Sequence, residues 1–150
     1  MKMLRMFLPI PGLMIISIFA SSAAEMEQDF IVTQTEQIVW EENSQSVQRQ
    51  LIFGDPAKEG FYVYRARFPA GVTSEPHFHT MDRSVTVIEG TWYAGTDASH
   101  DMGKTTAIPA GGHMFHPAGA IHYDGSRGEP AVVEIKGIGP VSTVYVDPAP

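Results

Sequence analysis

The chain has 150 residues and a formal net charge of −7, from 10 Lys and Arg against 17 Asp and Glu. This length is typical of one domain, and a content of 43% hydrophobic and 18% charged residues is ordinary for a soluble globular protein. An acidic chain without a basic stripe argues against a nucleic-acid partner and against docking on an anionic membrane. The absence of cysteine excludes disulfides, thiolate catalysis, cysteinyl zinc sites and iron–sulfur clusters.

The first 24 residues have the pattern of a secretory signal peptide. Lys2 and Arg5 precede an apolar run over residues 6–20, which is followed by the small residues Ser21–Ala24. The apolar run is shorter than the roughly 20 residues of a membrane span. We therefore expect cleavage after Ala24, a mature single domain over residues 25–150, and a periplasmic or secreted location. An uncleaved N-terminal anchor is the alternative.

From residue 30 onward the sequence has the pattern of an all-β protein. No stretch sustains the 3.6-residue apolar period of a helix, and short runs rich in Val, Ile, Tyr, Phe and Thr recur between Gly, Pro and Asp turn markers. About nine such strands with closely spaced turns are typical of a sandwich or barrel. In chain order, the expected strands are Phe30–Trp40, Val47–Phe53, Gly60–Phe68, Ser84–Ala94, Thr105–Ile108, His113–His116, Ala120–Tyr123, Ala131–Lys136 and Val141–Val146.

The histidines are concentrated in one part of the chain, because all six lie between His77 and His122. His77 and His79 are two residues apart, so on a strand their imidazoles project from the same face. Both can then reach one metal ion, for which a third ligand must come from another strand. His122, in a short apolar run after a Pro-Ala-Gly turn, is the natural candidate. The alternative is that the two strand histidines only form hydrogen bonds in a polar pocket.

The spacing around these histidines resembles the two motifs of the cupin family. The first motif matches at Gly71, His77, His79 and Gly90, and the second at Gly111, Pro117, Gly119 and His122, with Ser126 in the place of an Asn. The resemblance implies a double-stranded β-helix, or jelly roll, with a metal in the barrel mouth held by His77, His79 and His122. It also implies a homodimer.

One position departs from the cupin pattern, because Arg83 stands where the family has a metal-ligating Glu. A guanidinium stays charged in proteins and repels a nearby cation. In one interpretation three histidines hold iron, nickel, copper, manganese or zinc, and Arg83 turns aside or binds an anionic substrate. In a second, a nearby carboxylate replaces the Glu. Alternation points Asp82 to the opposite face. Glu75 shares the face of His77 and His79 but lies too far along the strand unless the chain bulges at Pro76, and Glu134 is possible on a later strand. In a third, the metal is lost and Arg83 binds an anion directly.

The sequence also suggests positions for the remaining histidines and for one acid. His116 can line the same pocket, as a contact to substrate or as a fourth imidazole. His113 is expected at a barrel rim, and His100 in a surface loop. Asp124 is in phase with His122 and is a candidate to orient an imidazole.

The functional hypotheses belong to different classes, because cupins share a fold while differing in chemistry. The first is an exported protein that binds a divalent transition metal and acts as an oxygenase or isomerase on a small anionic molecule. The alternative is a non-catalytic periplasmic module that binds or senses a metal or a small molecule. A third is a barrel that mainly dimerises. The expected partner is a small anion, with no nucleic acid and, after signal cleavage, no membrane.

Overall fold

The computed structural model describes residues 30–147 of the chain. The expected signal peptide and its cleavage site lie outside the described residues. Residues from Val32 onward form one compact unit. No helix within residues 30–147 has the length and apolar character needed to cross a membrane.

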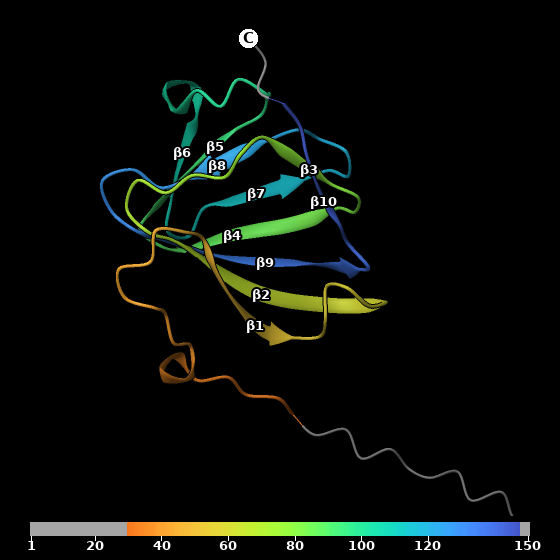
Figure 1. Ribbon diagram of the computed structural model, residues 1–150. Helices are drawn as coiled ribbons and strands as arrows, with labels where there is room; N and C mark the ends of the chain where they lie inside the picture. Colours follow the sequence, from red (N-terminus) through yellow and green to blue (C-terminus); the bar gives the residue numbers. More distant parts are fainter. Residues whose placement is uncertain (1–29, 148–150) are drawn as a thin grey trace, which may run out of the picture. The chain divides into compact units, whose positions relative to one another are not determined.

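The described residues form an antiparallel β-structure with two short 3-10 helices, which confirms the all-β prediction (Figure 1). The larger sheet has the order β1-β2-β9-β4-β7, and two smaller sheets have the orders β6-β5-β8 and β10-β3. The elements are β1 (Gln48–Phe53), β2 (Gly60–Phe68), β3 (His77–His79), β4 (Arg83–Glu89), β5 (Thr91–Gly95), β6 (Thr106–Pro109), β7 (His113–His116), β8 (Tyr123–Gly125), β9 (Ala131–Gly139), β10 (Thr143–Tyr145), η1 (Thr35–Gln37) and η2 (Met102–Lys104).

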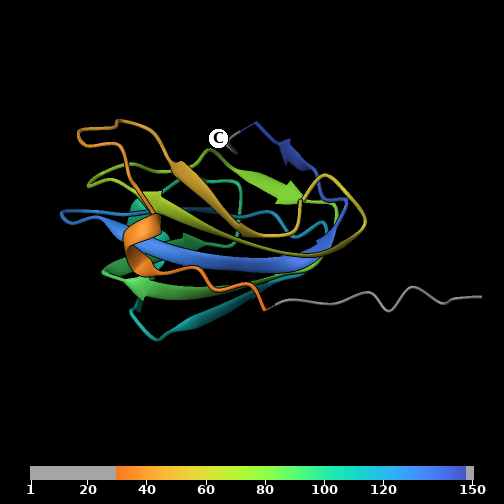
Figure 2. The same cartoon turned by 90° about the horizontal axis from the view of Figure 1, so that it is seen from below.

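Backbone hydrogen bonds join the two smaller sheets into one layer. The His77 N–H donates to the His122 carbonyl and the His122 N–H donates to the His77 carbonyl, each at 2.8 Å. Strand β3 is thereby held between β10 on one side and the residue before β8 on the other. The view in Figure 2 shows the long strands of the larger sheet and the smaller strands that lie across from them. Two facing antiparallel layers of this kind form a jelly-roll barrel.

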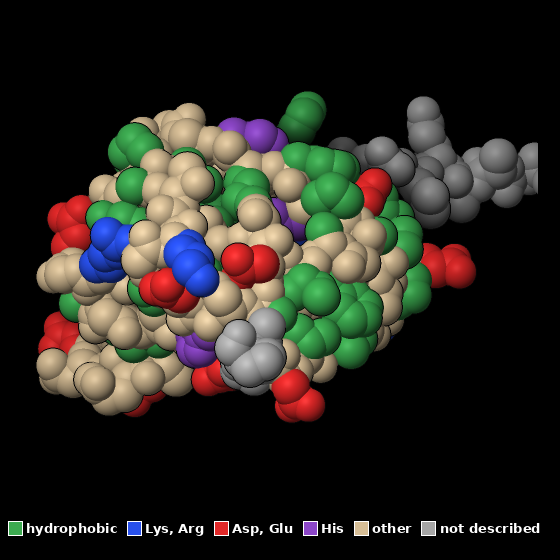
Figure 3. Space-filling model, turned by 90° about the horizontal axis from the view of Figure 1, so that it is seen from above, with side chains coloured by type: hydrophobic (Ala, Val, Ile, Leu, Met, Phe, Trp, Pro, Cys, Tyr) green, Lys and Arg blue, Asp and Glu red, His purple; other side chains and the backbone are tan. Residues whose placement is uncertain are grey.

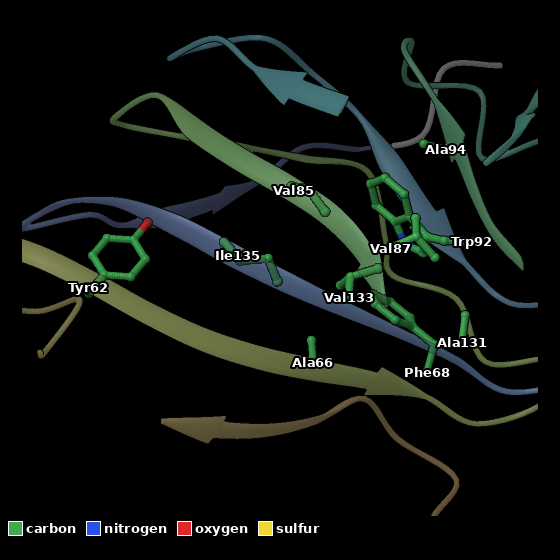
Figure 4. Packing of buried hydrophobic residues seen from close by; sticks show 10 residues of the cluster. All are labelled: Tyr62, Ala66, Phe68, Val85, Val87, Trp92, Ala94, Ala131, Val133 and Ile135. Atoms are coloured by element: carbon green, nitrogen blue, oxygen red, sulfur yellow. The ribbon is translucent and has the colours of Figure 1, made fainter. Parts of the chain in front are cut away.

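The core fills the space between the layers and follows the two-residue period of the strands. On the larger sheet the inward side chains include Tyr62, Val85 and Val133, each at most 1% exposed. Trp92 of β5, also 1% exposed, closes the core from the other layer, as the close-up in Figure 4 shows. Several of these apolar side chains, among them Val85, Val133 and Trp92, also line the compartment that holds the polar groups described below.

The prediction of a strand over Phe30–Trp40 is wrong. This segment contains the 3-10 helix Thr35–Gln37 and, within the described residues, no strand. The Gln37 side chain accepts the Gln34 backbone N–H at 2.6 Å, which closes a local turn instead of a ladder. Val32 and Val39 are each 68% exposed, so the apolar residues that suggested a strand have no sheet to pack on.

The expected strands Gly60–Phe68 and His113–His116 are present with the predicted ends, whereas the others have shifted ends and one of them is divided. Ser84–Ala94 is two strands, β4 and β5, because the chain turns at Gly90. Gly90 has a φ of +68°, and a Cβ there would collide with the Pro130 carbonyl oxygen, so the turn requires glycine. The expected strand Ala120–Tyr123 begins only at Tyr123, and Val141–Val146 shortens to Thr143–Tyr145.

Candidate metal centre

Three imidazoles from the smaller layer come together inside the barrel. His77 and His79 project from the same face of β3, and His122 lies opposite His77 across the backbone bridge. One ligating nitrogen of each ring lies within 4.8 Å of the others. The ring centroids of His77 and His122 are 4.3 Å apart, and those of His77 and His79 are 4.8 Å apart. This cluster, which we call the three-histidine cluster, could hold a metal ion.

Hydrogen bonds orient each ring of the cluster through its Nδ1 atom. His77 Nδ1 donates to the Glu75 carbonyl oxygen at 2.7 Å, and His122 Nδ1 donates to the Ala120 carbonyl oxygen at 2.9 Å. A carbonyl oxygen only accepts, so in both rings the proton is on Nδ1 and Nε2 keeps its lone pair. His79 Nδ1 is 3.1 Å from the Thr143 hydroxyl of β10. Partners of this kind fix the tautomer and direction of metal-ligating histidines.

The chemistry of the donor set fits a divalent transition metal. His77, His79 and His122 are 6%, 3% and 2% exposed, and the Nε2 atoms of His79 and His122 are buried without a hydrogen-bond partner. A buried lone pair without a donor is costly unless something else satisfies it. Neutral imidazoles suit zinc, copper, iron and nickel.

Burial keeps the imidazoles of His79 and His122 neutral. It lowers the pKa of His79 to about 2, and the positive charge of Arg83 acts in the same direction. Burial also lowers the pKa of His122, although the Asp124 carboxylate partly opposes this. A metal ion therefore competes with few protons for these nitrogens at neutral pH.

These shifts predict a pH-dependent stability of the metal-free protein. The pKa values are lower in the folded chain than the usual 6.5, so the unfolded chain binds more protons as the pH falls below that value. We expect the free energy of unfolding to drop by at least about 2 kcal/mol between pH 7 and pH 5. Urea denaturation of chelator-treated protein at each pH measures this, and His79→Gln should reduce the drop. A free energy that stays constant or rises toward pH 5 would contradict the burial of neutral imidazoles.

Arg83 points into the barrel beside the three-histidine cluster. It begins β4 on the inward phase, is 7% exposed, and donates from Nη1 to the Tyr64 hydroxyl at 2.9 Å. Its Nε is buried without a partner, and no carboxylate of residues 30–147 forms an ion pair with it. Arg83 thus points toward the cluster, and within the described residues its charge has no carboxylate partner.

The carboxylates proposed to replace the missing Glu lie elsewhere. Glu134 is on the outer face of β9, where it pairs with Arg65 at 3.1 Å and with Lys136 at 2.8 Å. The ion pairs and hydrogen bonds of these two cations lower its pKa, against the opposing effect of burial. Glu75 is directed to His100 at 3.3 Å. The interpretation in which a carboxylate replaces the missing Glu ligand is therefore wrong for Glu134 and for Glu75.

Two more acids have backbone or hydroxyl partners instead of imidazoles. Asp82 accepts the Ala118 N–H at 2.7 Å in the neighbouring loop. Asp124 is 5% exposed and accepts the Ser74 hydroxyl at 2.9 Å, so it does not orient an imidazole by a hydrogen bond as the sequence suggested. Its negative charge nevertheless lies near His122.

His116 is buried directly opposite Arg83, across the β4–β7 pair. It is 2% exposed, its ring centroid is 4.0 Å from that of His122, and it stacks on Trp92 at 5.8 Å. Neither ring nitrogen has a hydrogen-bond partner, and burial, followed by the nearby His122, lowers its pKa to about 2. His116 lies outside the three-histidine cluster but lines the same cavity.

The remaining histidines do not join the site. His113 is exposed on the outer phase of β7, 3.4 Å from the Thr86 hydroxyl. His100 was expected on the surface but is half-buried, because Thr73 and Glu75 both contact its ring.

Two spaces that share lining residues lie beside the cluster. The inner compartment, of about 40 Å³, is lined by His77, His79, Arg83 and His116 among others. The outer hollow, of about 450 Å³, opens beside it and is lined by residues of β1, β2 and β10 together with Arg83 and His79. Tyr64 and Arg49 line both spaces. Sequence reasoning missed Thr143 and Arg49, because no motif marks either residue.

A family model described as the ChrR Cupin-like domain matches residues 28–139. No curated protein sequence matches the chain significantly. Among solved structures, an oxalate oxidase in complex with the substrate analogue glycolate is similar with a TM-score of 0.60 and 19% identity, covering 83% of this chain and 67% of that chain. The DMSP lyase DddQ from Ruegeria pomeroyi DSS-3 has a TM-score of 0.58 and 19% identity over 69% of this chain, which spans about half (53%) of the lyase chain.

A cupin 2 domain-containing protein from Halorhodospira halophila also has a TM-score of 0.58, with 16% identity, covering 71% of this chain and 76% of that chain. Identities this low show the fold alone. The family match, however, spans about three quarters of the chain and agrees with the jelly-roll barrel. The chain therefore belongs to the cupin superfamily, in the family described as the ChrR Cupin-like domain.

Proposed function

We propose that this protein is an exported cupin that holds a divalent transition metal through His77, His79 and His122 and binds a small organic anion beside it. The observation that carries the proposal is the orientation of the cluster: Nδ1 of each ring has an oxygen partner, and the buried Nε2 atoms of His79 and His122 have none, which leaves them free to bind a metal. Export is supported by the N-terminal pattern of Lys2, Arg5, an apolar run and small residues.

The second half of the proposal, the binding of an anion, rests on Arg83. Its guanidinium is buried, is held in place by the Tyr64 hydroxyl, and keeps a buried Nε–H without an acceptor. A guanidinium binds carboxylates and phosphates through parallel N–H groups, and in a buried site this interaction is strong. When bound, the metal supplies a Lewis acid with open coordination positions. His116 can donate to the same anion as a neutral imidazole.

The distribution of charge supports a small anion over nucleic acid. On the face shown in Figure 3, Lys and Arg side chains lie beside Asp and Glu side chains instead of forming a stripe. The unpaired charge of Arg83 is directed inward, into a compartment of about 40 Å³. Only a small group of a ligand fits there, and the rest of the ligand extends into the outer hollow.

A catalytic form of this function is favoured by the Tyr64 hydroxyl. It lines both spaces and contacts Arg83 at 2.9 Å, where a phenol can give or take a proton at the ligand. Structural neighbours include proteins named as an oxidase and a lyase. We therefore propose a metal-dependent oxygenase or isomerase, with a binding or sensing module as the non-catalytic alternative. Oxygen-uptake and isomerase assays on the metal-loaded protein distinguish the two.

The test of anion binding is calorimetric titration of the metal-loaded protein with glycolate. We expect binding in the wild type and a loss of about tenfold or more in Arg83→Gln, because a charged hydrogen bond in a buried site disappears. Arg65→Gln, which removes a guanidinium on the outer face of β2, is the matched control and should bind as the wild type does. Equal affinity in the wild type and Arg83→Gln would contradict the role of Arg83.

A further inference from the structure

A second arginine, Arg49, lies at the mouth of the site. It is paired with Ala66 in the β1–β2 ladder, and Ala66 is part of the core, so both side chains are on the inner face of the sheet. Arg49 and Arg83 both line the inner compartment and the outer hollow. Arg49 is exposed, whereas Arg83 is 7% exposed. The two guanidinium groups therefore lie at the entrance and at the inner end of the same space.

The charge of this space is unusual for so acidic a chain. Within residues 30–147, neither arginine has a carboxylate within ion-pair distance, while Lys58, Lys136 and Arg65 each do. No Asp or Glu lines the outer hollow, and Asp124, the one acid among the residues that line the inner compartment, accepts a hydrogen bond from the Ser74 hydroxyl. Two arginines without an ion-pair partner among the described residues therefore face the same space, although the chain has a net charge of −7. Such a local excess of positive charge favours the binding of an anion.

We propose that the ligand is an organic dianion with two separated acid groups, one bound by Arg83 at the cluster and the other by Arg49 at the mouth. This inference rests on the proposed function, since Arg83 and the metal receive the first acid group. The two arginines approach this space from different places, because β1 and β4 are not neighbours in the order β1-β2-β9-β4 and Arg49 is in register with Val87, four residues beyond Arg83. Two acid groups separated by a carbon chain can therefore contact one guanidinium group each.

The experiment compares ligands with one and two acid groups on the metal-loaded, full-length protein. Calorimetry would use the dicarboxylates malonate, succinate, glutarate and adipate, each beside the monocarboxylate of equal chain length. We expect the longer dicarboxylates to bind more tightly than their monocarboxylate partners. Arg49→Gln should weaken the binding of the longer dicarboxylates about fivefold, the effect of one exposed ion pair, and leave the monocarboxylates unchanged. Arg49→Lys should restore part of the loss.

Arg67→Gln is the matched control, because Arg67 lies between the inward Ala66 and Phe68 on β2 and so faces outward. It should change neither class of ligand. Equal effects of Arg49→Gln on both classes, or no effect on either, would overturn the inference. The proposed function would still stand if both classes then required Arg83. If neither class binds the metal-loaded wild type, the inference and the proposed anion site both fall.

Discussion

The His77→Ala/His122→Ala variant is expected to retain less than about a tenth of the metal that the wild type binds, because a single remaining imidazole does not hold a divalent ion well. The two rings removed are those whose Nδ1 atoms are fixed by backbone carbonyl oxygens. Elemental analysis after reconstitution with each candidate metal, followed by dialysis, gives the measurement. We expect about one ion per chain in the wild type.

The control for this variant is His100→Ala/His113→Ala, which removes two imidazoles that lie outside the three-histidine cluster. It should bind metal as the wild type does. The backbone bridge between residues 77 and 122 does not need the side chains, so the double variant should keep its β-sheet circular dichroism. If the His77→Ala/His122→Ala variant and the wild type are both folded and bind equal amounts of metal, the three-histidine cluster does not hold the metal.

The Arg83→Glu variant is expected to bind metal about tenfold or more tightly than the wild type and to lose the binding of small anions. The substitution replaces a buried cation, which opposes a nearby metal ion, with a carboxylate, which attracts it. Competition with a chelator of known affinity measures the metal constant, and titration with glycolate measures the anion constant.

Arg83→Gln separates the two causes of this effect. It removes the positive charge without adding a ligand, so its metal affinity should lie between those of the wild type and Arg83→Glu. Tyr64→Phe removes only the hydroxyl that holds the guanidinium and should leave the metal affinity nearly unchanged. Weaker metal binding in Arg83→Glu than in the wild type would show that position 83 does not act on the metal.

Strand order along the chain was largely predictable, because alternation and turn residues are local signals. Alternation places Val85 and Val87 on the same face as Arg83, and all three side chains are buried. The strand predicted over Phe30–Trp40 is absent, because apolar and β-branched residues form a strand only where a partner strand pairs with them and covers them. Nothing in the local sequence shows that this partner is missing.

The site was predictable where a motif fixes the spacing. His77 and His79 follow from the two-residue period, and His122 follows from the Pro-Ala-Gly turn before it. Glu134 was misjudged because its direction depends on the pairing of β9 with β2 and β4, which places it opposite Arg65 and Thr86. Thr143 and its contact with His79 join residues 64 positions apart, so the contact exists only once β10 lies against β3.

The most direct test of the central claim is X-ray absorption spectroscopy of the zinc-reconstituted protein. If Nε2 of His77, His79 and His122 hold the ion, the spectrum will show three imidazole nitrogens at about 2.0–2.1 Å, with oxygen from water in the remaining coordination. Addition of a carboxylate ligand should change only the oxygen contribution. Zinc that binds without imidazole scattering, or a folded protein that binds no zinc at all, would contradict the account.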